Sequence, residues 1–322
     1  MEKAQTDKLQ MERVQTERNR APTIKMTPKT FAITGANGYV GSCISEYIAK
    51  KGMPVLKLGR KPSKDTVFFE FGALPQLSQS ASAIFKDVDF LIHCAWDFSK
   101  IKFEDSQKIN VEGSLLLFRA ARDAGVKKII LISTMSAFEG CTSDYGKAKL
   151  EIEKRVMAEG MSNVYFVRPG LVYGKNAKSV MGKLAILIRK LPVIPLLDTG
   201  VNTQLLYTCH NEDLGELIYR VCISEMFPPL TPITAANSNG FTLRQLLTKM
   251  AQAIGRPAPS FFSVPYSLLH TILGISEKIG LRIFRSDSLV SLMNLDPKPD
   301  FSAIGEDKMK FREFEPGVIN PN

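Results

Sequence analysis

The sequence predicts an α/β fold: a doubly wound parallel sheet with a smaller C-terminal lobe that binds the substrate. Three observations lead to this prediction. Short apolar runs, typical of buried strands, alternate with helical runs over the first half of the chain. A glycine-rich turn joins the first strand to the first helix, and from about residue 175 the alternation gives way to prolines and mixed helices. Strands that alternate with helices are typical of a parallel sheet covered on both faces.

The stretch from 30 to 52 places a strand, a turn and a helix in immediate succession. Phe31–Thr34 form a short apolar strand, and Gly35, Gly38 and Gly41 follow at three-residue spacing. Glycine permits a tight turn and a close approach of the backbone to a ligand. The free N–H groups and the positive dipole end of the helix face the same turn. We therefore expect this turn to bind a pyrophosphate.

The second strand, residues 54–58, ends where a dinucleotide fold places the residue that meets the adenosine ribose. That place reads Gly59-Arg60-Lys61, without Asp or Glu. A carboxylate there would bind the ribose hydroxyls and repel a 2′-phosphate, whereas a guanidinium grips that phosphate through two parallel bonds. Arg60 therefore favours NADP as the cofactor, with NAD as the alternative. In the other interpretation Arg60 is a solvated loop charge.

The remaining elements and the domains follow in order along the chain. We expect strands at 67–71, 88–95, 128–132 and 164–167, helices at 105–124 and 145–158, and a return to the main sheet at 210–222 and 232–236. Residues 1–28 are polar and would form a flexible arm. Residues 29–174, rejoined by 203–236, would form the dinucleotide-binding domain, and residues 175–202 and 237–322 the substrate lobe.

The composition of the 322 residues limits the kind of protein. The net charge of +10 is spread along the chain and favours phosphorylated small molecules as ligands. The sequence lacks the alternation of aromatic and basic residues that would indicate a surface for stacking nucleic-acid bases. The five cysteines lack a CxxC pair and the three histidines are scattered, so we expect no metal and a reducing compartment, the cytoplasm. The first 20 residues lack the apolar region of a secretory signal, and we expect no transmembrane segment.

A tyrosine and a lysine four residues apart, in Tyr145-Gly-Lys-Ala-Lys149, carry the predicted chemistry. On a helix this spacing puts the phenol and the ammonium on one face. Tyrosine has an unperturbed pKa of about 10, and a nearby cation favours the phenolate. Just upstream, Ser133-Thr134 end a strand at the carboxyl edge, where ligands of open α/β sheets bind. A hydroxyl there would bind a substrate oxygen while Tyr145 moves a proton, and Lys149 would also hold the nicotinamide ribose.

Five motifs together resemble one known family. They are TGANGYVG at 34–41, HCAW at 93–96, ST at 133–134, YGKAK at 145–149 and RPGLVYG at 168–174. They resemble the extended short-chain dehydrogenase/reductases, the branch of NAD-dependent epimerases and dehydratases that act largely on nucleotide sugars. The resemblance covers about residues 29–220 and implies a Rossmann domain, a Ser/Thr-Tyr-Lys triad and a C-terminal substrate lobe.

The resemblance also implies roles for individual residues. Thr134 would polarise the substrate oxygen, Tyr145 would act as acid or base, and Lys149 would lower the pKa of Tyr145. Asn110 matches an Asn that steadies the active-site helix in this family. The implied cofactor contacts are Gly35, Asn37, Gly38, Tyr39 and Val40 along the pyrophosphate, His93, Cys94 and Ala95 near the adenosine and ribose, and Pro169 and Val172 beside the nicotinamide.

Departures from the family's pattern leave alternatives open. The Asp that commonly contacts adenine near the third strand is replaced by Gly72 or its neighbours. The connection after the ST motif is shorter than epimerases usually have, which makes Ser133 and Ser136 rivals to Thr134. His93 invites a general-base interpretation, but its place in a strand is more typical of a packed or backbone-bonded histidine.

We predict an NADP-preferring oxidoreductase that reduces a keto group on a nucleotide-linked sugar. Arg60 motivates the reductase, because a net reductase draws on the NADPH pool at each turnover, whereas an epimerase keeps its cofactor. The alternatives are an epimerase or dehydratase with retained NAD, and a non-catalytic cofactor-binding scaffold. Basic residues of the later lobe would clamp the substrate diphosphate, with FRSDSL at 284–289 as the preferred candidate; they include Arg189, Arg244, Arg282 and Arg285. The resemblance also implies a homodimer through the helices at 105–124 and 145–158.

Overall fold

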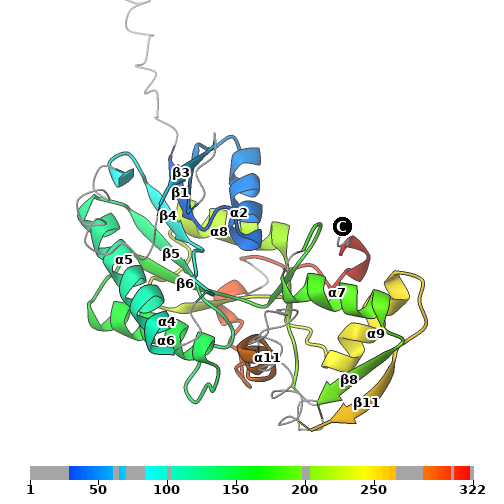
Figure 1. Ribbon diagram of the computed structural model, residues 1–322. Helices are drawn as coiled ribbons and strands as arrows, with labels where there is room; N and C mark the ends of the chain where they lie inside the picture. The colour runs from blue at the N-terminus through cyan, green and yellow to red at the C-terminus, as the bar shows by residue number, and fades with distance from the viewer. Residues whose placement is uncertain are drawn as a thin grey trace, which may run out of the picture.

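The computed structural model of the chain describes residues 29–60, 65–69, 84–99, 103–177, 179–197, 204–265, 286–305 and 308–319. The predicted arm at 1–28, the position near Gly72 and the first two residues of the preferred clamp at 284–289 lie outside these residues. Within the described residues, helices cover both faces of a parallel sheet, and a smaller lobe follows (Figure 1).

A seven-stranded parallel sheet forms the centre of the molecule, in the order β10-β6-β5-β4-β1-β2-β3. Strand β1 lies between β2 and β4, so the chain builds the sheet first toward one edge and then toward the other. This is the doubly wound arrangement, and it confirms the predicted fold class. The strand bounds are β1 Phe31–Thr34, β2 Val55–Gly59, β3 Thr66–Phe68, β4 Phe90–His93, β5 Lys128–Ile132, β6 Val164–Pro169 and β10 Pro232–Ala235.

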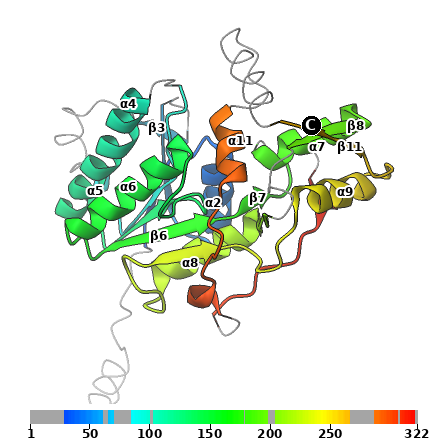
Figure 2. The ribbon, with the colours of Figure 1, turned by 90° about the horizontal axis from the view of Figure 1, so that it is seen from below.

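Two layers of helices cover the sheet (Figures 1 and 2). Helices α2 and α8 pack on one face, against strand residues that include Phe31 and Ile33. Helices α5 and α6 pack on the other face, against Ala32 and Leu91. Successive residues of β1 join different clusters because strand side chains alternate between the faces of a sheet. The helix bounds are α2 Tyr39–Lys50, α5 Gly113–Asp123, α6 Asp144–Ala158 and α8 Asn211–Ile223.

The helical run predicted at 105–124 contains a π-helical turn. Helix α4, Phe103–Ser106, passes into the π turn η1, Gln107–Glu112, which leads directly into α5. Such turns within α-helices are frequent at functional sites. Here the turn holds the fully buried Asn110 against the backbone of Asp97. The Asn110 Nδ2 donates to the Asp97 carbonyl at 3.0 Å, and its Oδ1 accepts from the Asp97 N–H at 2.8 Å.

A smaller lobe lies beside the carboxyl edge of the sheet. Its buried cluster includes Met181 and Leu184 of α7 and Leu246 of α9. Strands β8 and β11 form a parallel pair in this lobe, and β7 pairs with β9 near the main sheet. No helix among the described residues combines the length and apolarity needed to cross a membrane. The bounds are β7 Leu171–Tyr173, α7 Val180–Lys190, β8 Val193–Leu197, β9 Thr208–His210, α9 Leu243–Ala253 and β11 Ser260–Val264. The predicted domain boundaries stay a prediction.

Helix α11, Ser286–Met293, returns from the lobe to lie against α6 (Figure 2). The Ser136 hydroxyl is 2.9 Å from the Ser291 carbonyl oxygen and 2.8 Å from the Ser291 hydroxyl. The Thr142 N–H donates to Asn294 Oδ1 at 2.6 Å. The late part of the chain therefore covers the short connection between β5 and α6.

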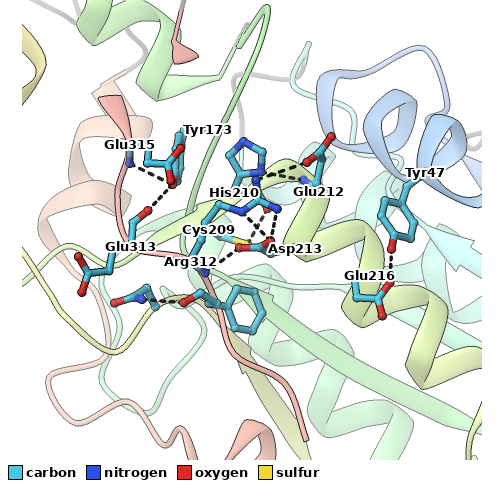
Figure 3. Close-up of polar contacts among 12 residues, drawn as sticks. Tyr47, Tyr173, Cys209, His210, Glu212, Asp213, Glu216, Arg312, Glu313 and Glu315 are labelled. Carbon is cyan, nitrogen blue, oxygen red and sulfur yellow. Dashed lines mark hydrogen bonds and ion pairs between the residues drawn. The ribbon is translucent and has the colours of Figure 1, made fainter. Parts of the chain in front are cut away.

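The C-terminal residues 308–319, which we call the C-terminal strap, fasten onto β7 and the start of α8 (Figure 3). Arg312 donates from Nε to Asp213 Oδ1 and from its backbone N–H to Oδ2, both at 2.9 Å. The Tyr173 hydroxyl donates to the Glu313 carbonyl at 3.0 Å. The Asp213 side chain is only 10% exposed, and the strap supplies a hydrogen-bond donor to each of its two carboxylate oxygens.

Asp213→Ala is expected to weaken the fold. The substitution leaves two donor groups of Arg312 without their acceptor, at an expected cost of about 1–3 kcal/mol in the free energy of unfolding. Glu212→Ala is the matched control, because this half-exposed carboxylate also pairs with Arg312, at 3.4 Å, and exposed pairs contribute less than about 1 kcal/mol. Urea unfolding measures both variants, and equal losses would contradict the role assigned to Asp213.

Candidate active site

The carboxyl edge of strands β1, β4 and β5 brings most of the predicted site residues together. The strands end at Thr34, His93 and Ile132. The glycine turn follows β1, the HCAW segment follows β4 and the ST motif follows β5. Ligands of open parallel sheets bind at this edge, so the topology places the cofactor turn next to the Tyr-Lys helix.

The glycine turn is packed so closely that a side chain at Gly35 or Gly41 would meet backbone atoms. Gly35 has φ +67°, and a Cβ at this position would lie 2.7 Å from the backbone nitrogen of Ala95. A Cβ on Gly41 would meet the Gly35 carbonyl. Helix α2 begins after Gly38 with no side-chain cap and no acidic residue in its first turn, so its first N–H groups face the turn. This cradle fits the pyrophosphate of a dinucleotide.

The side chains of Tyr39 and Val40 pack inward from this turn. The Tyr39 ring contacts both the sheet cluster and the lobe cluster. Burial raises the pKa of Tyr39 above its usual range. Asn37 is exposed, and its Oδ1 is 3.4 Å from the Thr66 hydroxyl. At positions 39 and 40, therefore, the backbone rather than the side chain faces the predicted pyrophosphate site.

His93 is fully buried and supports the strand ends. Its Nδ1 is 2.8 Å from the Thr34 hydroxyl, and its Nε2 is 3.1 Å from the Ser114 hydroxyl. Ser114 donates its own proton to the Asn110 carbonyl, so the ring donates from Nε2 and accepts at Nδ1. Burial, reinforced by the Lys149 charge, lowers the pKa of His93 well below its ordinary value. The ring is therefore neutral, and it is a packed histidine of the kind that its strand position indicates.

Arg60 lies at the end of β2 and reaches toward the loop that follows β4. Its guanidinium is 61% exposed and 3.6 Å from the Asp97 carboxylate. The Asp97 Oδ1 also accepts from the Ser99 N–H at 2.9 Å. Sequence reasoning missed Asp97, because only the fold brings this loop beside the end of β2.

Tyr145 and Lys149 lie on one face of α6, as their spacing predicts. Ser143 begins the helix by accepting the Gly146 N–H at 3.0 Å, which places the half-buried Tyr145 in the first turn. One turn later, Lys149 Nζ donates to the Ile132 carbonyl at 2.7 Å and lies 5.9 Å from the centre of the Tyr145 ring. Only 2% of Lys149 is exposed, and burial lowers its pKa to about 7.

Trp96 joins this pair, although the sequence analysis gave this last residue of the HCAW motif no role of its own. The Trp96 ring lies 4.3 Å from Lys149 Nζ and meets the Tyr145 ring edge-on, with centres 5.1 Å apart. A cation over the face of an indole is attracted by the ring's negative face. Trp96 therefore replaces part of the hydration that the Lys149 ammonium loses on burial.

The three hydroxyls near the end of β5 differ in their surroundings. Ser133 is buried and donates to Glu153 Oε1 at 2.5 Å, while Ser136 is buried and bonded to α11. Thr134 is half-buried, and its hydroxyl oxygen accepts from the Ser136 N–H at 3.2 Å. Because that contact uses a lone pair of the Thr134 oxygen, its proton is directed elsewhere. Of the three, Thr134 has the hydroxyl best placed to meet a ligand.

Glu153 is a further buried charge that sequence reasoning missed. It is 1% exposed and accepts from Arg168 Nε at 3.1 Å and Nη2 at 2.5 Å. Two-point pairing of this kind is the strong form of an ion pair. The signal was present in the spacing, since Tyr145, Lys149 and Glu153 recur every four residues on one face of α6.

The predicted nicotinamide residues follow β6. Pro169 ends this strand opposite Ala235 of β10 and is half-buried. Val172, in β7, packs into the sheet cluster with 7% of its surface exposed. Val172 therefore supports the wall of the site from behind. In the described part of the chain, no group of three or more His, Cys, Asp and Glu residues is arranged to hold a metal ion.

Gly35→Ala is expected to lower both stability and affinity for a dinucleotide, because the new Cβ meets the backbone of Ala95. Gly52→Ala is the matched control: Gly52 also has positive φ, +76°, but no atom lies within 4 Å of its Cβ position. The control should lose only about 1 kcal/mol from backbone strain. Thermal unfolding and NADPH titration separate the effects, and unchanged NADPH affinity in Gly35→Ala would count against the cradle.

Comparisons with known proteins agree with this geometry. Residues 31–223 match the model of the NAD dependent epimerase/dehydratase family. The chain is 24% identical over 257 residues to a UDP-glucose 4-epimerase of Vibrio cholerae, covering 71% of this chain and 77% of that protein. It is 26% identical over 233 residues to a ceramide reductase of Caulobacter vibrioides, covering 70% of each chain.

A solved structure shares the fold. The dTDP-4-dehydrorhamnose reductase of Bacillus anthracis, in complex with NADP, superposes with a TM-score of 0.61 at 18% identity, over 74% of this chain and 86% of that one. The strand order, the glycine turn and the family match point the same way. The chain therefore belongs to the NAD dependent epimerase/dehydratase family and is an NAD(P)-dependent enzyme.

Proposed function

We propose that this enzyme reduces a keto group, with Thr134, Tyr145 and Lys149 as its catalytic residues. The observation that carries the proposal is the position of Lys149. Its buried Nζ is held by the Ile132 carbonyl at 2.7 Å, beside the Tyr145 ring and two residues before Thr134. The three proposed groups, a hydroxyl, a phenol and a cation, belong to the end of β5 and the first turns of α6, the edge where ligands of parallel sheets bind.

A dinucleotide held at the glycine turn would supply the hydride for the carbonyl carbon. The Thr134 hydroxyl donates a hydrogen bond to the carbonyl oxygen and so orients the substrate. Tyr145 then transfers its phenolic proton to that oxygen, which becomes the hydroxyl of the product. Lys149 stabilises the phenolate that remains, because its ammonium lies on the same helix face. The Ile132 carbonyl keeps the ammonium in place during this change of charge.

The hydrogen bonds of Ser133 and Ser136 favour Thr134 over these two serines as the group that binds the substrate oxygen. The Ser133 proton is committed to the Glu153 carboxylate, and the Ser136 hydroxyl to Ser291 of α11. Using either of them would break a buried hydrogen bond, which costs about 1–3 kcal/mol. Thr134 carries no such cost.

NADP is the preferred cofactor in this proposal, with NAD as the alternative. Arg60 stands where the adenosine ribose is expected, and its exposed guanidinium is available for exchange between the Asp97 carboxylate and a 2′-phosphate. The preference for NADP supports net reduction over epimerisation, because a reductase consumes a reduced cofactor at each turnover. An epimerase or dehydratase that retains NAD is the second candidate, supported by the epimerase named among the relatives.

The nucleotide-linked sugar stays a prediction for the substrate. It is supported by the names of two similar proteins, a UDP-glucose 4-epimerase and a dTDP-4-dehydrorhamnose reductase. Of the basic residues predicted to clamp a diphosphate, Arg244 stacks on the Phe261 ring at 4.5 Å. Arg282 and Arg285 lie outside the described residues, so the preferred clamp at 284–289 is also still a prediction.

Three wider expectations also remain proposals. The cytoplasm is the proposed compartment, supported by five cysteines that are all free thiols. The implied homodimer would use the outer faces of α5 and α6. A non-catalytic scaffold is the rival function, and it is disfavoured by a buried lysine that a scaffold would have no reason to keep.

Tyr145→Phe is expected to abolish turnover and leave cofactor binding intact. The ring and its contact with Trp96 remain, but the proton donor is lost, so kcat should fall by a factor of about 10²–10⁴. NADPH affinity should change less than about twofold, since the hydroxyl is a small part of the cofactor's contacts. Single-turnover kinetics and NADPH titration measure the two quantities.

Tyr47→Phe is the control for this substitution. Its hydroxyl bonds Glu216 between α2 and α8, away from the site, so its loss should not affect kcat. A Tyr145→Phe variant with normal turnover would eliminate the triad. If the Tyr145→Phe variant binds NADPH and fulfils the protein's cellular role as well as the wild type does, the scaffold is favoured.

Arg60→Ala is expected to weaken NADPH binding about tenfold or more and to leave NADH binding unchanged, because a charge-assisted contact to the 2′-phosphate is lost. Arg122→Ala is the matched control, an exposed arginine that pairs with Asp123. The nucleotide released from freshly purified protein should also be identified. Tightly held NAD in that sample would overturn the assignment and favour the epimerase.

A further inference from the structure

We infer that Trp96 and Phe98 form an aromatic wall beside Tyr145 that binds an apolar group attached to the substrate carbonyl. The inference rests on the proposed ketone reduction but departs from the sugar predicted from the sequence: it names as substrate a ketone with an aryl or long alkyl substituent. We use the name aromatic wall for the rings of Trp96 and Phe98, which lie on either side of the Tyr145 ring.

The Tyr145 ring contacts the rings of both Trp96 and Phe98. Tyr145 lies between its two neighbours, with ring centres 5.1 Å from Trp96, edge-on, and 6.0 Å from Phe98, at an interplanar angle of 33°. Trp96 also covers the Lys149 ammonium at 4.3 Å. The phenol that would donate the proton is therefore flanked by apolar surface on two sides.

The loop that carries Trp96 and Phe98 is fixed by hydrogen bonds from Asn110. Asn110, fully buried in the π turn, binds both the N–H and the carbonyl of Asp97, the residue between the two aromatics. The Asp97 carboxylate is in turn 3.6 Å from the Arg60 guanidinium. Because the centre of the loop is anchored, both rings are presented to the site in a set arrangement, which lowers the entropic cost of binding against them.

The exposure of Phe98 indicates what the wall binds. Its side chain is 52% exposed beside the catalytic phenol, and burying such a ring against an apolar group is favourable. A sugar ring would bring several hydroxyls to the same surface, and each needs a hydrogen-bond partner when it leaves water. Of the three hydroxyls near the end of β5, those of Ser133 and Ser136 are already committed to partners within the protein. An aryl or alkyl ketone therefore suits this surface better than a sugar.

The single tryptophan of the chain makes a direct binding test possible. Trp96 is that tryptophan, so all indole emission reports on the wall. The full chain is titrated with acetophenone, 2-undecanone and UDP-glucose, with and without NADP⁺. We expect a saturable change in emission with one or both ketones and none with UDP-glucose. Acetophenone alone would assign a planar aryl group, and 2-undecanone alone an alkyl chain. A response to UDP-glucose with no response to either ketone would overturn the inference.

Variants at Phe98 test the wall itself. Phe98→Ala should raise the Kd of the responding ketone about tenfold, and Phe98→Leu, which keeps an apolar surface, less than about threefold. Phe262→Ala is the matched control, because Phe262 is 51% exposed but lies on β11 in the lobe. It should leave the ketone Kd unchanged, and NADPH affinity should be constant in all three variants. Equal ketone affinities for Phe98→Ala and Phe262→Ala would refute the wall.

The two proposals fail in different ways. If Tyr145→Phe still turns over a ketone, the proposed chemistry is wrong, whatever Phe98 does. If Tyr145→Phe is inactive while Phe98→Ala binds and reduces the ketones like the wild type, the chemistry stands and the aromatic wall is wrong.

Discussion

The buried Lys149 is the constraint on which the active site depends. An ammonium that leaves water must find partners inside the protein, and here these are the Ile132 carbonyl and the face of Trp96. The carbonyl comes from β5, the indole from the loop after β4, and the lysine from α6. These three elements must therefore meet at one point, which is the point where the proposed chemistry takes place.

A second buried charge holds the same helix from one turn further on. Glu153 accepts the Ser133 proton and the Arg168 guanidinium, so α6 is tied to the ends of both β5 and β6. Lys149 and Glu153 together fix the rotation of α6 about its axis. Tyr145 shares their face and so points toward the edge of the sheet. The position of the phenol is thus a consequence of two buried polar attachments rather than of its own contacts alone.

The late part of the chain is fastened to the sheet domain at two places. Helix α11 is bonded to Ser136, and the C-terminal strap is bonded to Asp213 at the start of α8. These contacts join residues more than 90 positions apart in the sequence. Helix α11 thus covers the short connection between β5 and α6, whereas the strap is fixed to β7 and the start of α8.

The sequence by itself determined the parallel sheet, the glycine turn and the shared face of Tyr145 and Lys149. Each of these is a local pattern, set by burial period or by spacing along one helix. Only the tertiary structure decided that Ser133 and Ser136 are committed, that Asp97 meets Arg60 and that Trp96 covers Lys149. The physical reason is that a side chain's partners depend on which distant segments pack together. A local pattern reports how a residue is oriented on its own element, and carries no record of what approaches it from another.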